Sequence, residues 1–177
     1  MRLYLTLAMI FCAFTGTGDA QSAAELLRRL PLANAVEAKR LEIRIARLWS
    51  RSGSASIDLL LQRGTDAFEA GDEIGAVEHL TAVTDHAPHF AEGWHRRAQA
   101  YLALDLVGPA VADLERCLAL NPNHFAALRG LGGIFEMLRQ PDRALAVYEA
   151  FLAIYPEHSA VRSARDRLLA AAQGNRI

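Results

Sequence analysis

The sequence has no surplus of charge of either sign, and this absence narrows the choice of partner. Its 19 lysines and arginines are balanced by 20 aspartates and glutamates, which gives a net charge of −1. Proteins that bind the phosphates of nucleic acids carry a basic excess on one face, so we expect no nucleic-acid partner. The 177 residues are 52% hydrophobic and 22% charged, a composition typical of one ordinary folded domain.

Motifs for catalysis and for metal binding are also absent. The sequence has no G-x-S-x-G, no H-E-x-x-H, no phosphate-binding loop and no pair of cysteines at metal-binding spacing. The six histidines form no such motif either, and we interpret them as loop and surface residues. The acidic residues around Asp72 are explained by helix capping, since aspartate is a favoured N-cap residue. We therefore expect no catalytic residue, no metal site and no cofactor.

Residues 1–20 have the layout of a secretory signal peptide. Arg2 supplies a positive start, residues 3–14 carry no charge, and the small residues Gly18 and Ala20 stand at the −3 and −1 positions of a cut before Gln21. The apolar run is shorter than the roughly 18 residues that a membrane span needs. We therefore expect an exported, periplasmic protein, cleaved near Ala20, with no membrane span in the mature chain. An uncleaved anchor is the alternative.

Removal of this leader would leave Cys117 as the only cysteine, and no internal disulfide could then form. Leu114, Cys117 and Leu118 fall on one face of a predicted helix, which favours a core position for the thiol. A lone thiol in an oxidising compartment is best tolerated when it is buried. A reactive or intermolecular cysteine is the alternative.

A period of 34 residues runs through the chain from about residue 57 to residue 156. Pro88, Pro122 and Pro156 are spaced at this interval. Four columns in phase indicate a repeated structural unit. The three further columns are Leu60, Trp94 and Leu128; Gly64, Ala98 and Gly132; and Ala76, Ala110 and Ala144.

The columns have physical reasons. Proline cannot continue a helix because it lacks an amide hydrogen and clashes with the preceding turn, so each proline closes a unit. Two helices cross closely only where a side chain is almost absent, which glycine and alanine permit, and large residues such as Trp94 and Leu114 fill the remaining gaps. One pair of helices cannot bury its own apolar face, so the units must stack.

Each block resembles a tetratricopeptide repeat, a helix–turn–helix unit of 34 residues. This family usually has an aromatic residue three positions after the first small residue. Tyr101 and Phe135 stand there in the second and third blocks, whereas the first block has Ala67 and is the weakest match. The resemblance implies an all-α, helical-repeat solenoid of three units, at residues 57–90, 91–124 and 125–156.

Helices are also predicted on both sides of the repeats. An apolar stripe of helical spacing runs from Leu41 to Trp49, and the sequence RSGSAS at 51–56 then breaks the helix. We expect residues 21–56 to be an N-terminal helical extension that caps the open end of the first repeat. A dimerisation or partner helix is the alternative. Residues 157–177 should form a C-terminal capping helix and tail, because a stack of repeats needs a polar end.

In the resembled family, the first helix of each unit lines a concave groove that usually holds a peptide or a partner helix. The family's carboxylate clamp wants lysine, asparagine and arginine where this chain has Leu61, Thr65, Arg96, Ala126 and Gly130. The clamp is absent, so a chaperone C-terminal tail is not the expected ligand. The resemblance implies ten groove residues: Gln62, Thr65 and Glu69 in the first unit, His95, Arg96, Gln99 and Leu102 in the second, and Arg129, Gly133 and Glu136 in the third.

We expect the protein to be a non-catalytic protein–protein interaction module. It would be an exported adaptor or assembly factor that binds a protein or peptide segment in its groove. His95, Arg96 and Arg129 would give this groove a modestly basic centre, which suits an acidic or mixed segment. The alternatives are a structural homo-oligomer formed through the terminal helices, and an accessory subunit of an envelope enzyme.

Overall fold

The computed structural model describes the backbone of residues 17–174 and the side chains of residues 22–173, and in this part all regular elements are helices. The predicted all-α solenoid is confirmed. Residues 1–16 of the expected leader lie outside the described part, and none of the described helices combines the length and the apolar character that a membrane crossing requires. The elements are α1 (Thr17–Arg29), the 3-10 helix η1 (Leu30–Leu32), α2 (Ala35–Trp49), α3 (Ala55–Glu69), α4 (Glu73–His86), α5 (Ala91–Ala103), α6 (Val107–Leu120), α7 (Phe125–Met137), α8 (Pro141–Ile154) and α9 (Ser159–Gly174).

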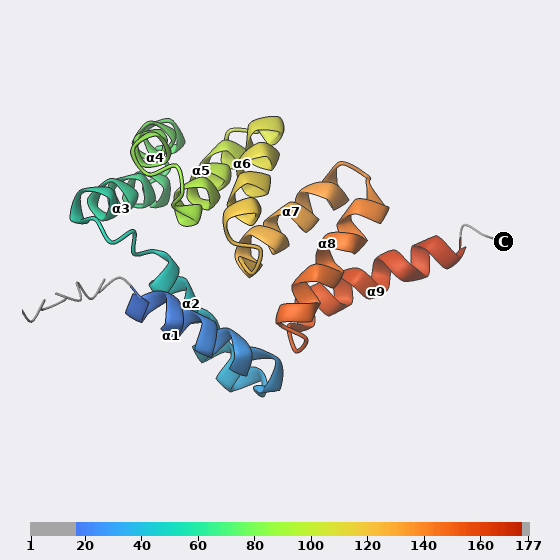
Figure 1. Ribbon diagram of the computed structural model, residues 1–177. Coiled ribbons are helices and arrows are strands. Elements are labelled where there is room, and N and C mark those ends of the chain that lie inside the picture. The colour runs from blue at the N-terminus through green and yellow to red at the C-terminus, as the bar shows by residue number, and fades with distance from the viewer. Residues whose placement is uncertain (1–16, 175–177) are drawn as a thin grey trace, which may run out of the picture.

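Helices α3 to α8 form three helix–turn–helix pairs that follow one another in an arc (Figure 1). The second helices of the pairs are α4, α6 and α8, and each ends two residues before a proline. Pro88, Pro122 and Pro156 therefore mark equivalent corners, as the period of 34 residues predicts.

The turn inside each pair has the same backbone conformation. Gly71, Asp105 and Arg139 stand at equivalent positions with φ of 78°, 58° and 56°, in the left-handed region. The next residue in each turn donates its N–H to the carbonyl oxygen five residues earlier, at 2.9 Å in all three turns. This bond satisfies a carbonyl that the end of the first helix leaves without a helical partner.

Small residues lie where the two helices of a pair cross. A Cβ atom added at Gly64 would overlap the side chain of Leu80, and one added at Gly132 would overlap the ring of Tyr148. The corresponding position in the second pair is Ala98, which is 2% exposed. A larger side chain at these positions would push the helices apart, so the small residues set the distance between them.

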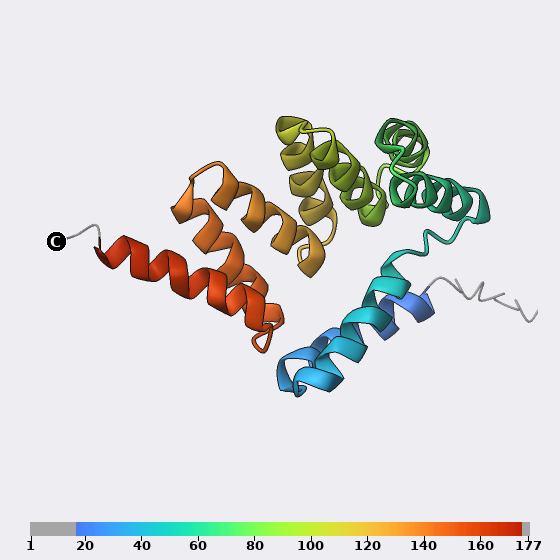
Figure 2. The same cartoon turned by 180° about the vertical axis from the view of Figure 1, so that it is seen from behind.

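The N-terminal pair α1–α2 is not placed as the sequence predicts. Figures 1 and 2 show it below the arc of α3 to α8 rather than as an extension of the stack at α3. Leu30, Leu41 and Ile45 belong to the core cluster of the second and third units, whereas α3 and α4 have a core cluster of their own. The expected cap over the open end of the first repeat is therefore corrected.

The reason for this placement lies at the end of α2. Gly53, with φ of 83°, lies in the short linker that breaks the chain between α2 and α3. The indole of Trp49 stacks on the imidazole of His124, with ring centroids 4.8 Å apart, and lies 5.0 Å from the ring of Phe125. The apolar stripe of α2 thus finds its partners at the junction between the second and third units.

At the C-terminal end, α9 packs on α8. Val161 and Ala164 are buried members of the main core cluster, while Arg162 and Asp166 are exposed. One face of α9 therefore covers the last pair and the other faces solvent, as expected of a capping helix.

Cys117 lies in the core, as predicted. It is 0% exposed, and burial raises the pKa of its thiol far above the usual range. A thiol held neutral in this way is a poor nucleophile, so its position favours the structural interpretation over a reactive cysteine.

Two adjacent glycines of α7 provide a test of the helix crossing. We expect Gly132→Ala to lower the free energy of unfolding by about 1–3 kcal/mol, because the new methyl group meets the Tyr148 ring. Gly133→Ala should instead raise it by up to about 1 kcal/mol, since a Cβ there meets nothing within 4 Å and alanine favours the helix. Urea denaturation followed by circular dichroism measures both, and equal effects at the two positions would contradict the assigned packing.

Candidate partner-binding groove

A hollow of about 360 Å³ lies between the first helices α5 and α7. Five of the ten predicted groove residues line it: His95, Gln99 and Leu102 on α5, and Arg129 and Gly133 on α7. Leu114 of α6 and Ile134 of α7 add apolar surface. We call this space the apolar hollow.

Two glycines keep the apolar hollow open. Gly130 and Gly133 are one helical turn apart on α7 and present no side chain toward it. A Cβ at Gly133 would meet nothing within 4 Å, and one at Gly130 would make only ordinary contact with Leu114. Leu102 and Met137 at its border are 36% and 57% exposed. The space is therefore accessible, with apolar side chains ready to be covered.

A second hollow, of about 350 Å³, lies between α3, α5 and the segment that follows α2. Three predicted groove residues line it, namely Gln62, Thr65 and Arg96, together with Asp58 and Asp66. The carboxylate of Asp58 already accepts hydrogen bonds from the amide and the hydroxyl of Ser52, at 2.7 and 2.6 Å. We call this space the polar hollow.

Glu69 and Glu136, the remaining two predicted residues, line neither hollow. Glu69 is an exposed residue at the end of α3. The carboxylate of Glu136 accepts a hydrogen bond of 2.6 Å from the Tyr148 hydroxyl and lies 3.4 Å from the guanidinium of Arg167. Glu136 thus connects α7 to α8 and α9 instead of facing the apolar hollow.

The two predicted groove arginines differ in their availability. The Nε of Arg96 donates to Glu92 at 2.6 Å, so much of its charge is used within the protein. Arg129 is exposed, and it makes no hydrogen bond or ion pair with the residues that the structure describes. Of the two, Arg129 is the cation that a partner can reach.

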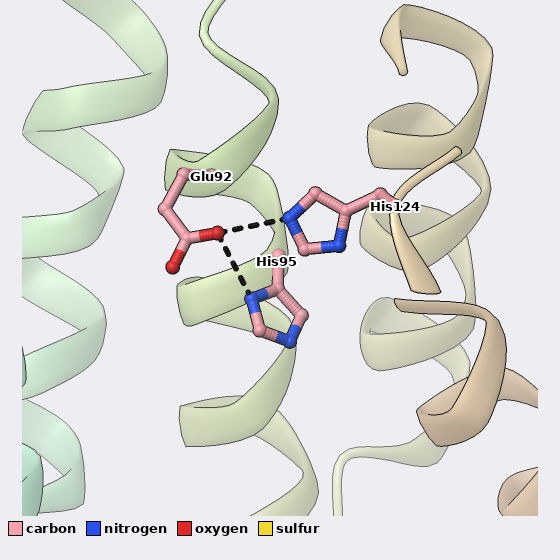
Figure 3. A group of neighbouring side chains, drawn as sticks. All are labelled: Glu92, His95 and His124. Atoms are coloured by element: carbon pink, nitrogen blue, oxygen red, sulfur yellow. Dashed lines mark hydrogen bonds and ion pairs between the residues drawn. The ribbon is translucent and has the colours of Figure 1, made fainter. Parts of the chain in front are cut away.

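Behind the hollows lies a buried group of three side chains, Glu92 and His95 on α5 and His124 before α7 (Figure 3). They are 4%, 6% and 1% exposed. Oε2 of Glu92 lies 2.9 Å from Nε2 of His124 and 3.3 Å from Nδ1 of His95. The interpretation of the histidines as loop and surface residues is therefore wrong for His95 and His124.

The repeat spacing of His124 and His158 does reflect a shared role. Nδ1 of His124 accepts the amide hydrogen of Ala127 at 3.2 Å, and Nδ1 of His158 accepts that of Val161 at 3.3 Å. Each imidazole thus caps the helix that follows a closing proline. Sequence period predicts this equivalence, but it does not reveal that His124 also reaches Glu92, 32 residues earlier.

The protonation of the group follows from these contacts. Burial alone would raise the pKa of Glu92, but hydrogen bonds from His124 and His95 and the charge of Arg96 hold that pKa well below its usual range. Burial lowers the pKa of His95, and the neighbouring Glu92 carboxylate opposes the change only in part. Near neutral pH the group is a carboxylate with two neutral imidazoles.

The ligand atoms of this group lie within 4.8 Å of one another, so we tested whether they fit a metal ion. Because Nδ1 of His124 accepts an amide hydrogen, its proton must sit on Nε2, where it is donated to Glu92. A metal at Nε2 would move that proton to Nδ1, against the amide hydrogen of Ala127. Metal-binding histidines instead donate their other ring N–H to an acceptor. The residues therefore fit a hydrogen-bonded junction better than a metal site.

Comparison with known proteins places the repeats in a family. Residues 91–124 and 126–158 each match a family model described as tetratricopeptide repeat. A TPR repeat-containing protein of Rhizobium etli is 33% identical over 135 residues, which are 76% of this chain and 65% of that protein. The chain thus spans less than two thirds of that relative's length.

Solved structures show the same fold. The first TPR of Spaghetti (RPAP3) bound to the HSP90 peptide SRMEEVD superposes with a TM-score of 0.63 at 23% identity, over 66% of this chain and 93% of that one. The TPR2B domain of yeast Sti1, in its pHsp70 complex, gives a TM-score of 0.59 at 25% identity, over 69% and 99%. The residues of these domains that differ from ours are considered below.

Acid should destabilise the protein, and His95 should account for part of the loss. In the unfolded chain a histidine takes up a proton near pH 6.5, about its ordinary pKa, whereas the lowered pKa of buried His95 prevents this in the fold. The folded state then binds fewer protons, so the free energy of unfolding falls as the pH drops through about 6.5 and below.

We expect His95→Gln to reduce the fall in thermal midpoint between about pH 7.5 and pH 5.5. His86→Gln, which alters an exposed histidine, should leave the fall unchanged. His158 also has a pKa lowered by burial, so some fall should remain in the His95 variant. Parallel pH profiles for the wild type and the His95 variant would show that His95 does not contribute.

Proposed function

The chain is a tetratricopeptide-repeat protein, and on this premise we propose that it is a non-catalytic protein-interaction module that binds a segment of a partner protein along its first helices. The observation that carries the proposal is the apolar hollow between α5 and α7, which Gly130 and Gly133 leave open. Partly exposed Leu102 and Met137 border it. An accessible apolar hollow with a few polar groups at its edge is the usual form of a binding site.

The similar structures support a peptide as the kind of ligand. Two of them carry peptides from HSP90 or Hsp70, by their descriptions. We do not extend those partners to this chain, because Leu61, Ala126 and Gly130 stand where the family's carboxylate clamp needs polar side chains. Two of these three, Ala126 and Gly130, line the apolar hollow instead. The groove is thus suited to a segment of different chemistry.

We further propose that the protein is an exported adaptor or assembly factor of the periplasm. Support comes from the sequence of residues 1–20, with its uncharged run and the small residues before Gln21. Cleavage there is compatible with the fold, because the buried side chains described in α1, Ala23 and Leu26, both follow the cut.

A structural homo-oligomer is the second candidate, and one observation favours it. Leu32 and Val36, at the tip of the α1–α2 pair, are 88% and 65% exposed. Exposed apolar side chains that lie close together are typical of contact surfaces. Self-association through this tip and binding along the first helices are separate properties, and they call for separate measurements.

Site-specific cross-linking tests the interaction module. We expect a photo-reactive residue at Gln99, which is exposed and lines the apolar hollow, to cross-link a partner from a cell-envelope extract. The same residue at Ala119, exposed on the second helix α6, should not. Gly133→Leu fills the hollow without touching other atoms and should remove the Gln99 product.

The matched control for added bulk is Ala119→Leu, which should leave the Gln99 product intact. A product that survives Gly133→Leu would show that the partner does not occupy the apolar hollow. Light scattering of the same samples, with Leu32→Ser as a comparison, reports self-association independently of capture.

Fractionation tests the proposed location. Expressed with its leader in a Gram-negative host, the protein should appear in the periplasm with Gln21 as its first residue. Ala20→Arg should block cleavage, because the −1 position requires a small residue. N-terminal sequencing of each fraction measures both. A full-length chain in the membrane fraction would instead identify an uncleaved anchor, and one in the cytoplasm would contradict export.

A further inference from the structure

The apolar hollow has an apolar lining with one formal charge. Among its polar members, Gln99 and His95 are uncharged near neutral pH, since burial lowers the pKa of His95. Arg129 carries the charge, and no carboxylate lines the hollow. Glycines 130 and 133 form part of the wall. The apolar members are Ala98, Leu102, Leu114, Ala126, Ile134 and Met137.

The size of the hollow limits what can enter it. Its volume of about 360 Å³ is near the lower end of the roughly 300–1,000 Å³ found for ligand pockets. The space therefore suits one large side chain of a segment lying across α5 and α7.

The charge at the border selects what can stand beside that side chain. Arg129 makes no hydrogen bond or ion pair within the described residues, and it is exposed. Arg96 is held by Glu92 at 2.6 Å, and Glu136 by Tyr148 at 2.6 Å. The nearest charged side chains are thus engaged inside the protein, and Arg129 is left to meet the charge of the partner.

We propose that the occupant is a protein segment that inserts one large apolar side chain, such as Leu, Ile, Met or Phe, into the apolar hollow and sets a carboxylate beside it at Arg129. This inference rests on the proposed function, because it specifies the segment that the groove binds. The carboxylate is that of an aspartate or glutamate next to the apolar residue, or that of the partner's C-terminus. Both sources offer the same group to the guanidinium.

The two contacts contribute unequally. Covering a large apolar side chain strengthens binding by about tenfold or more relative to alanine. The pair at Arg129 is exposed to water, so we expect about two- to fivefold from it, decreasing as salt is added. The apolar residue should therefore decide whether a segment binds, and the carboxylate should decide between segments that carry it.

Labelled synthetic peptides on a glycine–serine background test the inference, with binding measured by fluorescence anisotropy to the purified protein. One position carries Leu, Phe or Ala, and its neighbour carries Glu, Gln or Lys. We expect Leu and Phe to bind about tenfold or more tightly than Ala, and Glu to exceed Gln, and Gln to exceed Lys. Each peptide is made as a free acid and as an amide, which distinguishes a side-chain carboxylate from a terminal one.

Variants locate the two contacts. Gly133→Leu should abolish binding of the Leu peptide, while Ala119→Leu, which adds the same bulk on α6, should not. Arg129→Gln should remove the preference for Glu over Gln and keep the preference for Leu over Ala. Arg40→Gln removes an exposed arginine of α2 and should change neither preference.

Equal binding of the Ala and Leu peptides, a preference for Lys, or no binding of any peptide would overturn the inference. The proposed function fails by a different result, namely a Gln99 cross-link that persists in Gly133→Leu. A groove-dependent cross-link combined with the wrong peptide preference would leave the interaction module standing and reject only this choice of segment.

Discussion

The close crossing of two helices at a residue with almost no side chain is the constraint on which the rest of the structure depends. Gly64 faces Leu80 and Gly132 faces Tyr148 with no room for a Cβ atom between them. Helices held this close form a thin pair that cannot cover its own apolar surface, so each pair must pack on the next. The first helices α5 and α7 are brought together by this stacking, and the apolar hollow is the space left between them.

Glycine has two unrelated roles in α7, and the contrast explains how one helix both packs and binds. Gly132 is buried because a neighbouring ring occupies the place of its side chain, whereas Gly133, the next residue, is exposed and opens onto the hollow. Successive residues of a helix point about 100° apart, so the two absences face different partners. A glycine in an exposed helical position weakens the helix by about 1 kcal/mol relative to alanine, and at Gly133 no packing contact offsets that cost.

Features that repeat were predictable from the sequence, and features that join one repeat to a non-repeating part were not. The prolines, the small columns and the burial of Cys117 follow from contacts that recur every 34 residues. The burial of His124 depends on Glu92, 32 residues earlier, and on Trp49 from the N-terminal extension. Eight of the ten groove residues line a hollow, but register shows only which face a residue takes. It could not show that Tyr148 and Arg167 would engage Glu136.

The N-terminal extension acts on the groove through the buried group rather than by covering the first repeat. Trp49 stacks on His124, His124 donates to Glu92, and Glu92 lies against His95, which lines the apolar hollow. Each member is held by the next and is buried, so the α5 wall of the hollow is positioned before any ligand arrives. A wall that is already ordered loses less conformational entropy on binding than one that must be ordered by the ligand. The α1–α2 pair, although outside the repeats, is therefore part of what keeps the hollow in shape.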